Sequence, residues 1–350
     1  MSGPVSLHER VAALLDRTGA LSTAMQARRI ARMSAISIVT FHRIAEVRED
    51  EPFDPDVVDA TPAQFRRHVE TLARFGTPIG FDTLVRALDG GKLPVNPVMI
   101  TFDDGYRSCR DVALPILREL GVPATFFIAT DFVTGRTLYW WEQVAAVLHE
   151  ARGRTVTLAY PGRLRVDASD PRARPMLDDV IKNTRELDVA RFLRELRAAF
   201  EVPWCSAIEA KLAAPLIMTW ADIRALSDAG MDIESHTCSH RVLDTLDDGE
   251  LRDELVNSRR DLEVQLGRPV RGISYPVGRR PTTRVRRAVA DAGYRIGLTN
   301  ATGVNYVWPG VMRMALPLDR FDIHRLATER TQSDAMFLTQ IAVPPLGFGG

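Results

Sequence analysis

The sequence predicts an α/β fold built around a parallel sheet or a barrel. Short apolar runs rich in β-branched residues recur at 35–42, 97–105 and 123–130, and helical segments separate them. Uninterrupted apolar strands of this kind are typical of parallel sheets, whose two faces are covered by helices. The length of 350 residues suits two average domains or one large α/β barrel.

The first part of the chain carries clear local signals. Residues 6–33 predict a helix, because Val11 and Leu14 belong to a set of apolar residues near helical spacing. We expect this helix to pack on the main domain, with contact to an anionic membrane surface as the alternative. From there to residue 130, the predicted elements are a strand (35–42), a loop (43–60), helices (61–76 and 81–88), a strand (97–105), a helix (109–120) and a strand (123–130).

Residues 136–215 interrupt this alternation and predict a mostly helical insertion beside the sheet. After it the alternation resumes, with helices at 220–229, 248–266, 282–292 and 331–342 and strands at 231–237, 270–275, 295–299 and 311–320. We therefore expect an N-terminal helical segment (1–34), a main domain (35–330) with its insertion, and a C-terminal helix with a loose tail (331–350).

Composition excludes several classes of protein. Lys+Arg and Asp+Glu are both 45, so the chain lacks the basic field of a general nucleic-acid binder. The three cysteines (Cys109, Cys205 and Cys238) are too few for a disulfide framework and fit a reducing compartment. No apolar run approaches the roughly 18 residues of a membrane span, and residues 1–20 contain no apolar run long enough for the core of a secretory signal. We expect a cytoplasmic protein with no stable membrane insertion.

Two adjacent acids give the strongest chemical signal. Asp103 and Asp104 end the apolar run at 97–102 and precede Gly105, which allows the chain to turn sharply. Buried carboxylates are costly unless ions or hydrogen bonds satisfy them, and strand ends are where barrels place their sites. The alternative interpretation is a helix N-cap with one spare acid.

A histidine pair gives the second signal, again after a short strand. His236 and His240 are four residues apart, so both imidazoles can face one point. Two imidazoles and a carboxylate make a three-ligand set with open positions, suited to Zn²⁺ or another divalent ion. Cys238 lies too close between them to serve as a further ligand.

A third signal is weaker by itself. Tyr275 and Pro276 begin a turn after the apolar run at 270–274, and such a turn can line a substrate groove or be an ordinary turn. Trp140 and Trp141 can stack on a sugar or anchor the core of the insertion.

Taken together, the segments TFDDG (101–105), SHTCSH (235–240), ISYPVG (273–278) and PATFFI (123–128) resemble the polysaccharide deacetylases of the NodB-homology type, carbohydrate esterase family 4. The resemblance covers roughly 35–330 without the insertion. It implies a distorted (β/α) barrel and a metal-dependent amide hydrolase. It also implies that Asp104, His236 and His240 bind the metal, most simply Zn²⁺, and that Asp103 is the general base.

Three further roles remain to be assigned: the donor to the oxyanion, the arginine that tethers the base, and the general acid. The Tyr106 N–H is our candidate donor to the oxyanion. The family often carries an arginine that tethers the base where this chain has Ser274, and we expect Arg320 to replace it. His42, which ends the first strand, resembles the N-terminal acid of one family branch; His324 is the alternative acid.

These features predict a hydrolase that removes N-acetyl groups from an amino sugar in a polysaccharide, oligosaccharide or lipid-linked glycan. The alternatives are another carbon–nitrogen hydrolase on the same scaffold, such as a deformylase, or a carbohydrate-binding protein with a decayed site. The expected partner is an N-acetylated glycan and not a nucleic acid, and the sequence leaves the oligomeric state open.

Overall fold

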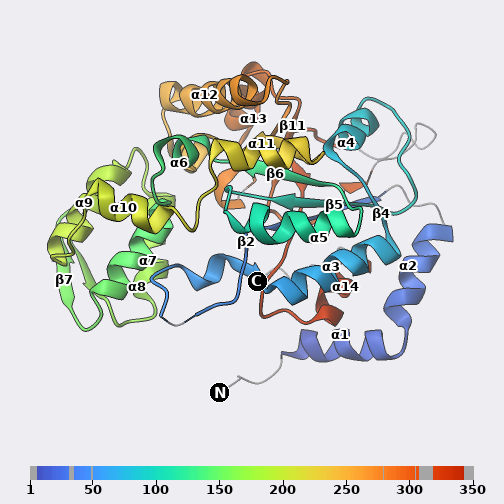
Figure 1. Cartoon of the computed structure of the whole chain (residues 1–350), viewed down its shortest axis with the longest axis horizontal. Coiled ribbons are helices and arrows are strands. Elements are labelled where there is room, and N and C mark those ends of the chain that lie inside the picture. The colour runs from blue at the N-terminus through green and yellow to red at the C-terminus, as the bar shows by residue number, and fades with distance from the viewer. Residues whose placement is uncertain are drawn as a thin grey trace.

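A computed structural model describes residues 6–30, 35–48, 50–278, 280–303, 305–306 and 318–342. The strands of its large sheet lie at the centre with helices around them, whereas strand β7 (Thr155–Leu158) lies at the edge beside α8 (Ala173–Asn183) and α9 (Val189–Ala199) (Figure 1). The predicted α/β class is confirmed, and the parallel strands form a nearly closed barrel with helices around it.

The barrel strands are parallel and follow one another around the sheet in chain order. They are β1 (Ala35–Phe41), β5 (Pro97–Phe102), β6 (Ala124–Ile128), β9 (Asp232–Ser235), β10 (Gly272–Ser274), β11 (Ile296–Thr299), β13 (Ile323–His324) and β14 (Leu326–Ala327). Strand β13 pairs with β11 and β14 pairs with β1. The chain passing through Arg325 therefore joins the two edges and nearly closes the barrel.

Smaller strands flank the barrel. Strand β4 (Thr77–Pro78) pairs with β5, and β12 (Asn305–Tyr306) pairs antiparallel with the start of β1. Two short pairs stand apart, β2 (Arg43–Ile44) with β3 (Val58–Ala60) and β7 (Thr155–Leu158) with β8 (Leu164–Asp167).

Helices with clear end signals form where the sequence predicts them. Helix α3 (Pro62–Phe75) begins with a reciprocal capping box between Thr61 and Gln64 and ends at Gly76. The other predicted helices of the main domain are α4 (Phe81–Leu88), α5 (Leu114–Glu119), α11 (Trp220–Asp228), α12 (Asp248–Leu266) and α13 (Thr283–Asp291). Helix α6 (Thr130–Gly135) was not predicted. Before α5, the residues Cys109–Ala113 form a π-helical turn, where we expected regular helix.

The interior of the barrel is packed with apolar side chains. One core cluster joins Ile38, Met99 and Phe127 of the barrel strands to Phe81 of α4. A Cβ at Gly272 would lie 2.2 Å from the Phe81 ring, so this close approach requires glycine. The Phe127 ring lies 5.7 Å from the Arg325 guanidinium carbon, which places this cluster directly beneath that buried cation.

The N-terminal segment differs from the predicted single helix. Gly19 adopts a φ of 73°, in the left-handed region that favours glycine, and separates α1 (Leu7–Arg17) from α2 (Ala20–Ile30). Both helices pack on α14 (Asp334–Ala342), the closing helix.

The insertion contains α7 (Trp140–Glu150), α8 (Ala173–Asn183), α9 (Val189–Ala199) and α10 (Ser206–Ala213), together with the unpredicted β7–β8 hairpin. Most of the predicted strand at 311–320 lies outside the described residues, and 318–320 are not a strand. Strands β13 and β14, which close the barrel, come later in the chain than that prediction.

Candidate active site

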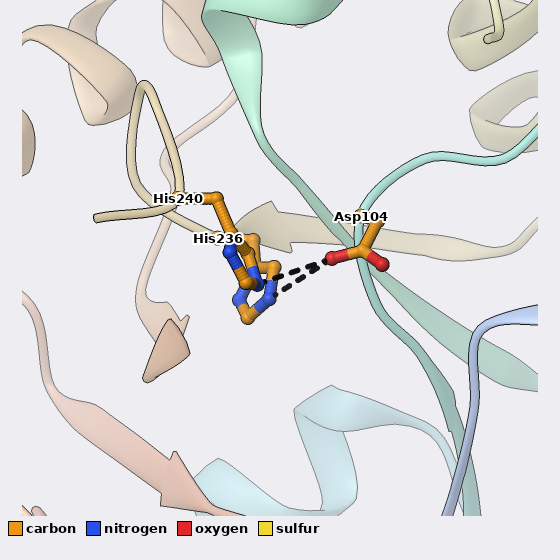
Figure 2. Close-up of side chains that lie close together, drawn as sticks. All are labelled: Asp104, His236 and His240. Carbon is orange, nitrogen blue, oxygen red and sulfur yellow. Dashed lines mark ion pairs between the residues drawn. The ribbon is translucent and has the colours of Figure 1, made fainter. Parts of the chain in front are cut away.

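Side chains that lie far apart in the sequence meet at the carboxyl ends of the barrel strands. Asp104 follows β5, while His236 and His240 follow β9. The Asp104 Oδ1 atom lies 3.3 Å from His236 Nε2 and 3.4 Å from His240 Nε2 (Figure 2). The structure thus brings together the three residues predicted to bind a metal.

The chemistry of this cluster fits a divalent cation. One ligand atom from each of the three residues lies within 4.8 Å of the others. Asp104 Oδ1 is buried and accepts no hydrogen bond among the described residues. Burial lowers the pKa of His240 to about 3, which keeps the imidazole in the neutral form that binds metals. A cation between these atoms would satisfy the orphaned carboxylate oxygen.

A backbone contact fixes the orientation of His236. Its Nδ1–H donates to the Ser274 carbonyl oxygen at 2.8 Å, so Nε2 carries the lone pair that faces Asp104. An outer partner of this kind sets the tautomer and the ring plane of a metal-binding histidine.

A buried carboxylate on α12 holds the loop between the two histidines. Glu254 accepts the Cys238 and Ser239 amides, each at 2.9 Å, and the Ser239 hydroxyl. Thr237 and His240 have φ angles of 66° and 57°, in the left-handed region that residues other than glycine seldom adopt. Glu254 therefore holds the loop in a backbone shape that its own sequence disfavours.

The second acid of the pair makes different contacts. Arg325 donates to Asp103 Oδ1 at 2.8 Å and to Oδ2 at 2.6 Å, and the Ser274 hydroxyl donates to Oδ2 at 3.1 Å. Burial alone would raise the pKa of Asp103, but Arg325, with help from His236 and His42, holds that pKa well below its ordinary value. Asp103 is therefore ionised at physiological pH.

The prediction that Arg320 tethers Asp103 is wrong. Arg320 lies at the surface, where it donates to Asp89 and to the Leu88 carbonyl. Arg325, five residues later, points from the closure of the barrel onto Asp103 and also contacts Ser274 at 2.7 Å.

His42 lies at the same site, at the end of β1. Its Nδ1 is 3.0 Å from Asp59 Oδ2, and its Nε2 is 4.0 Å from Asp103 Oδ2. Burial lowers the pKa of His42, but the Asp59 carboxylate, with smaller effects from Asp104 and Asp103, raises it to about 10. Asp59 also accepts the His42 backbone N–H, so it fixes both the ring and the chain.

Aromatic side chains of the insertion pack against His240. The Trp141 ring centroid is 4.6 Å from that of His240, and Trp141 Nε1 donates to the Tyr106 hydroxyl at 2.8 Å. That hydroxyl donates to the buried carboxylate of Glu142, also at 2.8 Å. Trp140 and Trp141 are both only 5% exposed, so they anchor the insertion and offer no open face to a sugar.

Two other predicted residues lie apart from the acids and histidines. The Tyr275 side chain is buried, and its hydroxyl donates to the Phe321 carbonyl at 2.9 Å, while Pro276 is buried in the turn that follows. Neither placement supports a side-chain contact with substrate. His324 lies 3.9 Å from Asp322, and no contact joins it to the acids of the site.

The sequence analysis did not identify Asp59, Glu254 or Arg325. Asp59 sits within a short apolar run (57–60), where a charged residue is costly unless it has a partner. That cost was the available signal. Arg325 lies between His324 and Leu326, and Glu254 lies in a polar helix, so nothing in the local sequence marks either residue.

Comparison with known proteins agrees with this geometry. The sequence model of the polysaccharide deacetylase family matches residues 90–168 and 193–297, together more than half of the chain. No curated protein matches the sequence.

Several solved structures share the fold. They include the Streptococcus pyogenes deacetylase PplD (17% identity, 89% of this chain and 100% of that chain, TM-score 0.57) and a Bacillus cereus polysaccharide deacetylase (18%, 88% and 69%, TM-score 0.53). IcaB from Ammonifex degensii is similar at 15% identity over 88% of this chain and 96% of that chain, with a TM-score of 0.52. With the family match, the chain belongs to the polysaccharide deacetylase family and is a deacetylase of the hydrolase class.

Proposed function

We propose that this deacetylase removes N-acetyl groups from an amino sugar of a glycan and that it requires a divalent metal ion, with Zn²⁺ as the ion we favour. The observation that carries the proposal is the position of Asp104 Oδ1, within 3.4 Å of both histidine Nε2 atoms and without a hydrogen-bond partner among the described residues. Two imidazoles and one carboxylate are a donor set that leaves room for water and substrate.

Asp104, His236 and His240 would hold the ion. When bound, a divalent cation would polarise the acetyl carbonyl and lower the pKa of a water molecule.

Asp103 is the proposed general base. Its carboxylate is buried beside Asp104, and Arg325 and Ser274 hold both of its oxygens in place. An ionised carboxylate in this position accepts a proton from the attacking water.

The proposed donor to the developing oxyanion is the Tyr106 N–H. Tyr106 follows Asp104 and Gly105, whose φ angles of 72° and 103° turn the chain sharply after β5. Within the described residues this N–H makes no hydrogen bond, which leaves it available to an oxyanion.

His42 is the proposed general acid. The leaving amine must gain a proton, because an amide anion is too poor a leaving group. His42 donates its Nδ1–H to Asp59 and therefore presents Nε2 toward Asp103. The His42 side chain is 25% exposed and that of His240 is 11% exposed, whereas the two acids are almost fully buried. The substrate would approach from the side of these two rings.

The missing family arginine at position 274 favoured the interpretation of a decayed binding protein. Arg325 occupies that role in the structure, which removes the reason for this interpretation. The three cysteines are free, which is compatible with a reducing compartment. We therefore retain the cytoplasmic location as a proposal, and cell fractionation tests it.

The decisive experiment measures acetate release from a panel of N-acetylated oligosaccharides and glycolipids, with and without a chelator. We expect activity that the chelator abolishes and Zn²⁺ restores. Asp104→Ala should lose metal and activity, whereas Asp103→Asn should keep metal and lose most of the rate. Release of formate from formamides in place of acetate would identify a deformylase instead. Full activity after complete removal of metal would disprove the proposal.

A further inference from the structure

Helix α1 exposes an apolar stripe to solvent. Leu7, Val11 and Leu14 recur every three or four residues and therefore lie on one helix face. They are 74%, 41% and 60% exposed. Figure 1 shows α1 along the edge of the molecule, outside α14.

The stripe is not needed to attach α1 to the fold. Ala12, on the other side of the helix, is buried, and α1 packs against α14. Glu9 accepts the backbone N–H of Ser333 at 3.2 Å and also the Ser333 hydroxyl, just before α14 begins. The helix is thus held by one face, and the apolar stripe faces away from the contacts that hold it.

Charge is distributed unevenly around this helix. Arg10 and Arg17, each three residues after a leucine of the stripe, lie beside it on the helix surface. Glu9 and Asp16 lie on the opposite side, where Glu9 is engaged with Ser333. The exposed apolar face therefore has a basic edge.

We propose that α1 docks this protein on the surface of an anionic lipid bilayer. An apolar stripe with arginines beside it is the pattern of a helix that lies in the plane of a membrane interface. In the part of the chain that the structure describes, no helix is long and apolar enough to span a membrane. The arginines attract lipid phosphates, and Leu7, Val11 and Leu14 insert among the headgroups.

Charge argues against a second copy of the chain as the occupant. An antiparallel symmetric dimer through this face would place the arginine edges of the two copies on the same side, close to each other. Like charges held together in this way oppose association. An anionic surface has the complementary charge.

The test is flotation of the full-length protein with vesicles. We expect binding to vesicles of phosphatidylcholine mixed with phosphatidylglycerol, little binding to phosphatidylcholine alone, and weaker binding as salt increases. Leu7→Ser and Leu14→Ser should each weaken partitioning about tenfold. Arg10→Gln and Arg17→Gln should each weaken it roughly fivefold.

Matched controls come from α12 and α5. Val264→Ser removes another apolar side chain that is 73% exposed, and Arg118→Gln with Arg252→Gln removes two exposed arginines elsewhere. These variants should bind vesicles like the parent chain, and acetate release from a soluble substrate should be unchanged throughout.

Equal vesicle binding by the parent and by Leu7→Ser/Leu14→Ser, or no binding at low salt, would overturn the proposal. A dimer in sedimentation that these two substitutions dissociate would assign the stripe to contact between copies and would overturn it as well. The flotation and sedimentation measurements do not depend on the catalytic proposal.

Discussion

The guanidinium of Arg325 makes a two-point contact with the carboxylate of Asp103, at 2.8 and 2.6 Å. Both side chains are fully buried, and Arg325 comes from the short segment that joins β13 to β14. The closure of the barrel therefore places Arg325 on the proposed general base.

Arg325→Met should reduce both stability and turnover. Removing one member of a buried ion pair leaves the other charge unpaired, which costs about 3–5 kcal/mol of unfolding free energy. Loss of the two-point contact should lower kcat at least about 100-fold, the scale expected when a reacting group is displaced by an ångström. Denaturant titration and kcat measurements check both effects.

Arg320→Met is the matched control, because Arg320 lies at the surface on Asp89. It should change stability by less than about 0.5 kcal/mol and leave kcat unchanged.

A second variant moves the arginine to the position where the family often carries it. In the Arg325→Ser background, Ser274→Arg should restore at least part of the activity. If Arg320→Met loses activity and Arg325→Met does not, the assignment of the tether is wrong.

Asp59→Asn should shift the pH dependence of the reaction. The Asp59 carboxylate raises the pKa of His42, so its neutralisation lowers that pKa. A general acid works only while protonated, and activity falls as pH rises through its pKa. The basic limb of the kcat/KM profile should therefore move to lower pH, with metal content unchanged. An unmoved basic limb would show that His42 is not the acid.

Local signals explain what the sequence predicts correctly. Helices α3 and α12 have capping boxes at Thr61 and Asp247 and a glycine after the last turn, so the local sequence predicts where each helix begins and ends. The proposed metal-binding residues lie in two short motifs, and they come together because the ends of parallel strands gather at one face of a barrel.

The features that the sequence analysis missed depend on tertiary contacts. Strands β13 and β14 have two residues each, too few to show a period of hydrophobicity. Which arginine reaches Asp103 is decided by that closure, and the sequence analysis therefore named Arg320 and did not find Arg325. Glu254 acts through hydrogen bonds to a loop about fifteen residues away in sequence, a relationship without a local pattern.

Glu254→Gln should weaken metal binding. The carboxylate accepts from the Cys238 and Ser239 amides and the Ser239 hydroxyl, and an amide side chain offers only one oxygen to these donors. Loss of a supporting partner of a metal site typically costs 10- to 100-fold in affinity, and we expect about that decrease.

Competition with a chelator measures the metal affinity, and the rise in Tm on adding Zn²⁺ should shrink in parallel. Asp253→Asn, an exposed neighbour on α12, should change neither quantity. Unchanged affinity in Glu254→Gln would mean that the loop keeps its shape without this contact.

His68 should make the fold sensitive to mild acid. Its ring is buried, stacks on Phe337 at 3.9 Å, and has no hydrogen-bond partner on either nitrogen within the described chain. Burial lowers the pKa of His68 to about 4, whereas an unfolded chain binds this proton near pH 6.5. The unfolded state therefore takes up more protons between these values, and stability falls as pH decreases from about 6.5 to 4, by about 3 kcal/mol in total.

His68→Phe keeps a ring against Phe337 and removes the titrating group. The difference in unfolding free energy between His68→Phe and the parent should therefore grow in favour of the variant as pH decreases. Parallel stability curves for the two proteins across this range would contradict the expectation, because they would mean that His68 takes up its proton equally in the folded and unfolded states.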